Sequence, residues 1–313
     1  MPILFSLSSV PFAGELLALV TVLCWSISVQ FFEAASRRIG SVAVNIIRIG
    51  AALLLFSLLL MYRGGAAVPT DFGLHAWLYL SLSGIIGFFI GDIFLFKALV
   101  EIGPRLAMLI YSLAAPSAAV IGWLVLGEQY QMSQWLGIFI TLSGVCLVIL
   151  EKAPAGKSSR GLQFRKASLK GVVFSILAML GQAVGYLLSK VGMQTEAGYL
   201  EPFASTQIRV IAAFVCLCLY FTATGKWTHL RRAFTDHRAV GQTLAGAVVG
   251  PFLGVSLSLL ILHYLTVGVA ATFLSLVPIF ILPFARFIHK EQVSPRAIVG
   301  AFVAVFGIYL LMV

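Results

Sequence analysis

One acidic residue lies well inside an apolar stretch, where a carboxylate is costly. Asp92 falls within the apolar run 74–98, and an isolated charge near the membrane centre costs about 2.5–3.5 kcal/mol on insertion scales. Such a residue usually faces a cavity or an ionic partner, so a carboxylate that is alternately protonated and paired could couple a proton to the movement of a solute. The alternative is a structural ion pair with Lys97 or Arg105.

Two arginines are placed alike in two other apolar runs. Arg48 and Arg209 each lie about six residues into their run, which is about 9 Å along a helix. If the two halves of the chain cross the membrane in opposite directions, Arg48 shares a side with Glu291. Arg209 then shares the other side with Glu128. Both pairs are predicted gate contacts between the halves; alternatively, the arginines snorkel to the interface and the glutamates cap helix ends.

Eight further polar or amphipathic side chains lie far from the ends of the apolar runs. Aromatic walls with a few hydroxyls and an amide suit a small zwitterion or a planar ligand. As a group these residues are predicted to line a central substrate site, although hydrogen bonding between packed helices is the alternative for each one. They are Trp25, Ser28, Tyr111, Ser112, Gln182, Tyr186, Ser256 and Ser275.

The residue types that support catalysis are not arranged for it. The five histidines are scattered, and the sequence has no HExxH motif, paired-acid motif or G-x-x-x-x-G-K-[ST] loop. All four cysteines fall inside apolar runs, which favours packing over a disulfide framework. The sequence therefore predicts no enzyme, no cofactor, no metal and no direct use of ATP. Energy would come from an ion gradient or from substrate exchange.

Composition defines the elements that must position these side chains. Of 313 residues, 60% are hydrophobic and 10% are charged, and the mean hydropathy is +1.04. A soluble domain carries roughly 25% charged residues, so this chain must lie mostly in lipid. The net charge is +10, but the basic residues lie between apolar runs. They indicate the anionic membrane surface rather than nucleic acid.

Ten apolar runs approach the roughly 20 residues that a membrane-spanning helix needs. The predicted fold class is an all-α integral membrane protein with ten transmembrane helices in two inverted five-helix repeats. Residues 12–150 form the first repeat, 151–167 a cytoplasmic linker and 168–313 the second repeat. Prolines at 116, 278 and 283 predict bends in the fourth and ninth helices. The predicted helices are 12–32, 42–62, 74–98, 103–126, 133–150, 168–191, 203–222, 238–263, 268–289 and 294–313.

The basic residues of the loops predict the orientation of the chain. Sixteen Lys and Arg residues fall on the side of the linker, whereas only Arg63 and Lys190 fall on the opposite side. Cytoplasmic loops carry the excess of positive charge in membrane proteins. The linker side is therefore predicted to be cytoplasmic, with both termini outside.

The two halves of the chain repeat one pattern. A shift of 163 residues aligns Gly127-Glu128-Gln129 with Lys290-Glu291-Gln292, places Ser112 on Ser275, and matches a glycine pair in the third helix, at 87 and 91, with one in the eighth, at 250 and 254. Because each repeat holds an odd number of helices, the second must enter the membrane upside down. Inverted repeats are typical of alternating access around a site near the membrane midplane.

Several stretches resemble one family. LGEQYQMSQWLGIFITLSGVCLVI (126–149) and GVAATFLSLVPIFILPFARFIHKEQVSPRAIVGAFVAVFGIYLL (268–311) resemble the repeat ends of the drug/metabolite transporter superfamily, EamA type. GDIFLFKALVEIGPRLA (91–107) and GPFLGVSLSLL (250–260) are similar to its third and eighth helices. The resemblance covers residues 14–313. It implies a ten-helix transporter of small metabolites that is coupled to protons or run by exchange. It also implies cytoplasmic termini, unlike the charge count.

Together these observations predict a secondary transporter, taken as an exporter of amino acids or related amphipathic compounds, in a bacterial inner membrane. Its predicted partners are the small-molecule substrate, the lipid bilayer and a coupling proton, with no nucleic acid, and a monomer suffices. The alternative is a membrane enzyme acting on a lipid or small molecule. An ion channel would show a re-entrant filter or rings of charge, which the sequence lacks.

Overall fold

The computed structural model describes residues 12–150, 168–196, 198–287 and 295–312. Within these residues, ten helices are long and apolar enough to cross a membrane. Their spans lie where the sequence predicts them, and the largest difference is at the first helix, which continues to Ile39 instead of ending near residue 32. The added turns carry an ion pair between Arg37 and Glu33, 2.6 Å long. Opposite charges at a four-residue spacing are compatible with a helix and stabilise it by at most about 0.5 kcal/mol.

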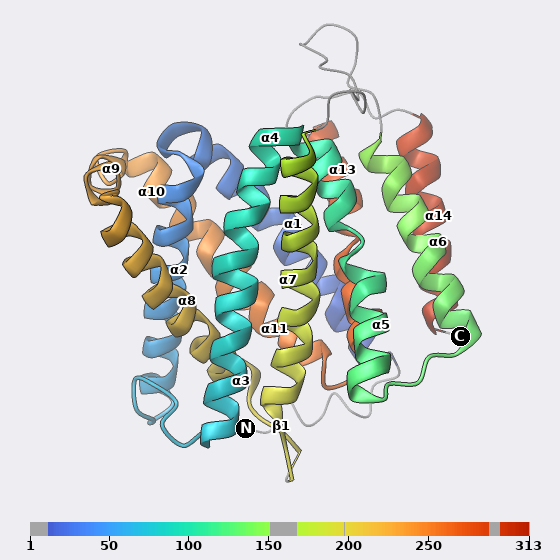
Figure 1. Ribbon diagram of the computed structural model, residues 1–313, viewed down its shortest axis with the longest axis horizontal. Helices are drawn as coiled ribbons and strands as arrows, with labels where there is room; N and C mark the ends of the chain where they lie inside the picture. Colours follow the sequence, from blue (N-terminus) through green and yellow to red (C-terminus); the bar gives the residue numbers. More distant parts are fainter. Residues whose placement is uncertain (1–11, 151–167, 197, 288–294, 313) are drawn as a thin grey trace, which may run out of the picture. The chain divides into compact units, whose positions relative to one another are not determined.

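The first repeat runs from α1 to α6 and the second from α7 to α14 (Figure 1). The elements of the first are α1 (Ala13–Ile39), α2 (Ser41–Tyr62), α3 (Leu74–Gly84), η2 (Ile85–Gly91), α4 (Asp92–Tyr111), α5 (Ala114–Leu126) and α6 (Met132–Ile149). The elements of the second are α7 (Leu169–Met193), β1 (Gln194–Thr195), β2 (Gly198–Tyr199), α8 (Pro202–Thr224), α9 (Trp227–Ala233), α10 (His237–Ala247), η4 (Val248–Gly254), α11 (Val255–Ile261), α12 (Val267–Leu274), α13 (Val277–Phe287) and α14 (Pro295–Met312).

The described chain packs as two compact units that do not coincide with the repeats. One unit contains residues 23–90 and 184–263, and the other contains the rest of the described chain. Each unit therefore combines corresponding parts of both repeats, and α1 and α7 each contribute to both units. The predicted linker, 151–167, lies outside the described residues.

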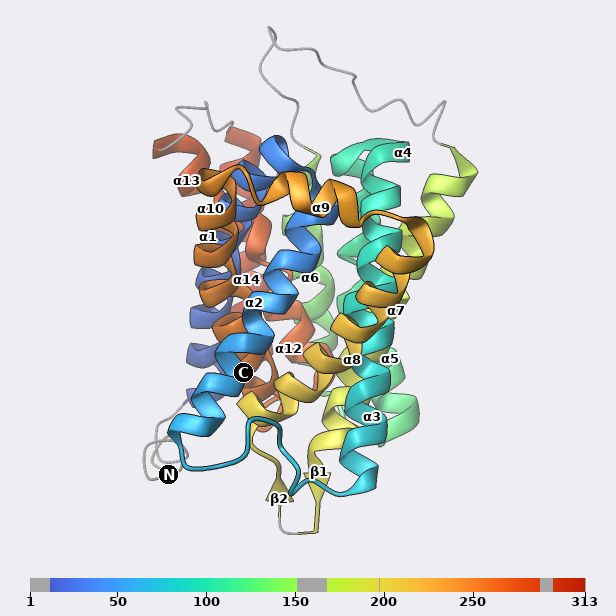
Figure 2. The same ribbon diagram turned by 90° about the vertical axis from the view of Figure 1, so that its left-hand side faces the viewer.

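The unit of residues 23–90 and 184–263 has a core between α2 and α8. Phe56 and Phe221 are fully buried there, and the Phe56 ring lies 4.9 Å from that of Phe252. At one end of this unit α9 lies crosswise between α8 and α10 (Figure 2). There Arg38 Nε donates to Asp236 Oδ2 over 2.8 Å. This ion pair and the acceptance of the Ala239 N–H hold the pKa of Asp236 below its usual value.

The other unit is organised by α6 and α14, which lie side by side (Figure 1). Glycines make this contact: a side chain at Gly144 would collide with the backbone of Ala304 and Gly300. Thr141 and Ala304 also meet, because the Thr141 hydroxyl donates to the Ala304 carbonyl over 3.4 Å. Small residues allow helix backbones to approach closely in lipid, where there is no hydrophobic force between helices.

Both repeats contain the same two helix irregularities. The π-helical stretches η2 and η4 replace α-helical geometry in the third and eighth spans, and their first residues, Ile85 and Val248, are 163 positions apart. The fourth and ninth spans break at equivalent serines, Ser112 and Ser275, where α5 and α13 begin anew two residues later. The predicted bends at positions 116 and 278 fall beside these breaks, whereas Pro283 lies inside the continuous helix α13.

Candidate functional site

The predicted substrate-lining residues divide equally between the two units. Trp25, Ser28, Tyr186 and Ser256 belong to the unit of residues 23–90 and 184–263. The other unit holds the remaining four, which are Tyr111, Ser112, Gln182 and Ser275. Their assignment as a single substrate site stays a prediction.

Trp25 and Ser28 on α1 pack closely against η4. A side chain at Gly250 would come within 2.8 Å of Ser28 Oγ, so glycine is needed for this close approach. Trp25 Nε1 donates to Ser258 Oγ over 3.4 Å. The hydroxyl of Ser256 instead donates to Phe252 O in its own helical segment, over 2.7 Å. Ser258 was not predicted as a substrate-lining residue. It lies two positions after Ser256, so the two side chains lie on opposite faces of the helix.

Ser112 and Ser275 mark the two helix breaks and make the same local bond. Ser112 Oγ donates to Leu109 O over 2.8 Å, and Ser275 Oγ donates to Thr272 O over 2.7 Å. Each hydroxyl thus satisfies a carbonyl three residues back, where the helix ends and its last carbonyls lack helical partners. Discontinuous spans of this type form the sites of many transporters.

Asp92 is the first residue of α4, directly after η2, and is half-buried. The nearby Lys97 is exposed, and its Nζ lies 5.5 Å from the ring centre of Phe174. The side chain of Arg105, the other cation considered as a partner, lies outside the described residues. The coupling role of Asp92 stays a prediction.

The matched arginines have different surroundings. Arg48 is half-buried, and its Nε donates to Asn45 Oδ1 over 2.8 Å. Arg209 is 2% exposed, and its guanidinium carbon lies 4.4 Å from the ring centre of Phe88. Phe88 did not stand out in the sequence, because nothing in an apolar run distinguishes one phenylalanine from another.

Glu128 caps the start of α12. The N–H of Val267 donates to both carboxylate oxygens, each at 3.0 Å, and the hydroxyl of Tyr130 donates to Oε2 over 2.5 Å. Burial and the carboxylate of Glu128 raise the pKa of Tyr130 well above its usual value. Glu291 lies outside the described residues. Both predicted gate pairs, Arg48 with Glu291 and Arg209 with Glu128, therefore stay predictions.

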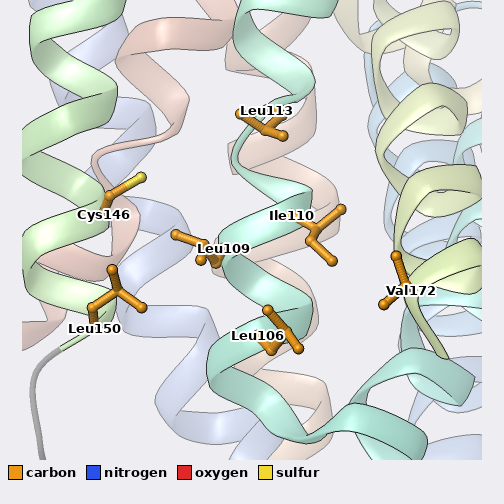
Figure 3. Close-up of a pocket in the computed structure, with 7 residues that line it drawn as sticks. All are labelled: Leu106, Leu109, Ile110, Leu113, Cys146, Leu150 and Val172. Atoms are coloured by element: carbon orange, nitrogen blue, oxygen red, sulfur yellow. The ribbon is translucent and has the colours of Figure 1, made fainter. Parts of the chain in front are cut away.

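A cavity of about 500 Å³ lies among α4, α6 and α7 (Figure 3). Its lining is apolar and shares no residue with the predicted substrate set. Such a lining complements a hydrocarbon group. The lining residues are Leu106, Leu109, Ile110, Leu113, Cys146, Leu150 and Val172.

Among the described residues, no three His, Cys, Asp or Glu side chains gather as metal ligands. The arrangement is instead one of buried hydroxyls, aromatic rings and one buried arginine in apolar helices. Ten such helices in two inverted repeats, with paired irregularities, define an integral membrane protein of the inverted-repeat transporter type.

The model of the EamA-like transporter family matches residues 12–150 and 169–313. The chain therefore belongs to the EamA-like transporter family, in agreement with the resemblance to the drug/metabolite transporter superfamily.

The chain is also similar to a curated protein and to a solved structure. Over 39 residues the chain is 51% identical to the permease-like protein YdzE of Bacillus subtilis (strain 168), a match that covers 12% of this chain and half the length of that relative. A solved crystal structure matches 95% of this chain and 96% of its own, with a TM-score of 0.71 at 14% identity. At that identity the likeness establishes the fold alone.

Proposed function

We propose that this protein is a secondary active transporter that exports small metabolites, such as amino acids or related amphipathic compounds, by alternating access. The observation that carries the proposal is the pairing of irregularities in inverted repeats. The third and eighth spans share a π-helical stretch, and the fourth and ninth share a break at a serine. Broken helices in inverted repeats are the usual construction of a midplane substrate site.

Transport would be driven by a proton gradient across a bacterial inner membrane. Asp92 is the candidate proton carrier because it is an acid within a membrane-spanning helix. The bias of loop charge supports a cytoplasmic linker and outer termini in a bacterial inner membrane, with the protein acting as a monomer.

Transport by the purified protein in liposomes tests the proposal. The liposomes are loaded with a mixed metabolite pool, and losses are read by mass spectrometry with and without a pH gradient. Loss of one compound class that follows the gradient is the expected result, and Asp92→Asn should abolish the dependence on the gradient. Equal loss under both conditions would assign the protein to exchange or facilitated diffusion. No loss above empty liposomes would contradict transport and reopen the membrane-enzyme alternative.

A further inference from the structure

Arg209 combines deep burial with hydrogen-bond donors that lack partners. The residue is 2% exposed, and no hydrogen-bond partner for its Nε or Nη1 exists among the described residues. Arg209 lies seven positions into α8, about 10 Å from the helix end. A side chain at that depth could in principle reach the interface by snorkelling. The burial shows that the guanidinium does not reach solvent. A buried cationic donor without an acceptor is costly, and inside a membrane it marks a functional site by default.

The equivalent arginine of the other repeat, Arg48, shows that the fold does not force an arginine at this position to lack a hydrogen-bond acceptor. Arg48 has an acceptor one turn back on its own helix, because Asn45 Oδ1 receives its Nε–H over 2.8 Å. The corresponding position in α8 is Thr206, whose hydroxyl donates to Pro202 O over 2.7 Å. The second repeat thus keeps the cation and omits its internal acceptor.

Close backbone contacts fix the position of Arg209. A side chain at Gly84 would collide with the backbone of Arg209 itself, so α3 and α8 touch at this residue. Gly185 of α7 packs on the same segment, since its added Cβ would lie 3.5 Å from the Cα of Gly87. The hydroxyls of Ser83 and Ser189 both donate to the carbonyl of Gly185, each over 2.7 Å. At this level α3 therefore packs against both α7 and α8.

The ring of Phe88 lies next to the guanidinium of Arg209. The guanidinium carbon lies over the Phe88 ring, 4.4 Å from its centre, a cation–π contact that satisfies neither Nε nor Nη1 as a hydrogen-bond donor. Tyr186 is 9% exposed and is an electrostatic neighbour of Arg209. A planar carboxylate matches the fork of guanidinium donors and accepts two parallel hydrogen bonds from it.

We propose that Arg209, which lies over the ring of Phe88, binds the carboxylate of the transported solute. The inference rests on the proposed transport function and specifies its substrate class as carboxylates, including amino acids. A single arginine matches a single negative charge, which favours a carboxylate over a phosphate dianion.

The test uses acid and amide pairs in the liposome assay. Liposomes containing the full-length protein are loaded with the twenty standard L-amino acids, benzoate, the α-carboxamides of those amino acids and benzamide, and losses are compared by mass spectrometry. The wild-type protein should export at least one acid about tenfold faster than its amide, the usual effect of a hydrogen bond between charged groups. Arg209→Gln should lower export of that acid at least about tenfold. The control Arg232→Gln removes an exposed charge on α9 and should leave export unchanged.

The outcomes separate this inference from the transport function itself. If the exported compounds leave equally fast as acid and amide, or if Arg209→Gln exports acids at the wild-type rate, carboxylate binding by Arg209 is refuted while transport stands. If no compound leaves, the transport function fails and this inference fails with it. Should Arg209→Gln not fold, equal export of acid and amide by the wild-type protein would still refute the inference. A rise in the melting temperature with the exported acid, but not with its amide, provides a second readout of binding.

Discussion

His263 shows how burial changes a single titration. Its ring stacks on that of Tyr199 with centres 4.6 Å apart, just beyond the end of α11. Burial, and then the charge of Lys190, lower the pKa of His263 to about 4 from an ordinary 6.5. Between these values the unfolded chain binds a proton that the folded chain does not. This residue therefore lowers the stability of the fold as pH falls from about 6.5 through about 4, and contributes nothing above that window.

We predict that His263→Gln removes the loss of stability that His263 causes at acidic pH. The melting temperature of the variant, relative to the wild-type protein, should be about a few °C higher at pH 5 than at pH 8. Thermal unfolding of the purified protein at both pH values measures the difference. The control is His237→Gln, which changes an exposed side chain at the start of α10. An identical pH response of His263→Gln and wild type would contradict the assignment.

A second prediction concerns the carboxylate at the start of α12. Glu128→Gln keeps an acceptor for the Val267 N–H but removes the charge that favours a helix N-terminus. It also weakens the acceptor for the Tyr130 hydroxyl. We expect a loss of about 1–2 kcal/mol in the free energy of unfolding, measured by thermal or denaturant unfolding.

The control for that prediction is Glu33→Gln. Glu33 forms an exposed ion pair with Arg37, and such pairs contribute little to stability. Unchanged stability of Glu128→Gln together with impaired transport would favour the gate pairing with Arg209 over capping. Rescue of transport by exchanging the charges of Glu128 and Arg209 would be the positive evidence for that pairing.

For individual residues, the sequence predicts which positions correspond between the repeats better than it predicts which side chains contact one another. Similar positions in their apolar runs pair Arg48 with Arg209, and the offset of 163 residues pairs Ser112 with Ser275. The structure shows matched local bonds at the serines. Neither Ser258 as the acceptor for Trp25 nor Phe88 beneath Arg209 follows from the sequence. Both contacts join segments more than 100 residues apart, and no local pattern encodes such a pairing.

Glycine contacts between helices give the prediction for the elements. Gly144 of α6 faces the backbone of α14, and an added methyl group would collide with Gly300 and Ala304. Because backbone atoms cannot rotate away, Gly144→Ala must separate the helices, at a cost of about 1–3 kcal/mol. The melting temperature in detergent should fall accordingly.

Gly241 of α10 is the matched control. Nothing lies within 4 Å of a side chain added there. Gly241→Ala should be neutral, or stabilising by up to about 1 kcal/mol through helix propensity alone. Equal melting temperatures for the two variants would show that the glycines of α6 are not required for packing.

Spans and bends of the helices could be predicted, but their internal geometry could not. Apolar length and polar loops fix the ends of the spans, and the prolines signal the breaks near Ser112 and Ser275. The π-helical stretches η2 and η4 were not predicted, because a local change from i→i+4 to i→i+5 bonding leaves no distinct pattern in an apolar run. The two compact units were also missed, since contacts between distant segments define them.

The orientation of the whole molecule can be tested by cysteine labelling. In a variant with its four native cysteines replaced by alanine, Tyr62→Cys adds an exposed thiol at the end of α2, and Thr228→Cys adds one on α9. A maleimide that cannot cross membranes should label the former in intact spheroplasts, because the loop charges predict that this end lies outside. The latter should be labelled only after lysis. The reverse pattern would show that both termini are cytoplasmic.

The matched π-helical stretches also bear on the history of the chain. An i→i+5 turn holds one more residue than an α-turn, and η2 and η4 hold the extra residue 163 positions apart. Their matching positions are what we expect if the extra residue was already present in an ancestor with a single set of five spans. To build an inverted pair, copies of that ancestor had to enter the membrane in both orientations, which requires similar positive charge on its two sides. On this account, the strong charge bias of the present protein would have become possible only after fusion, when each half needed a single orientation.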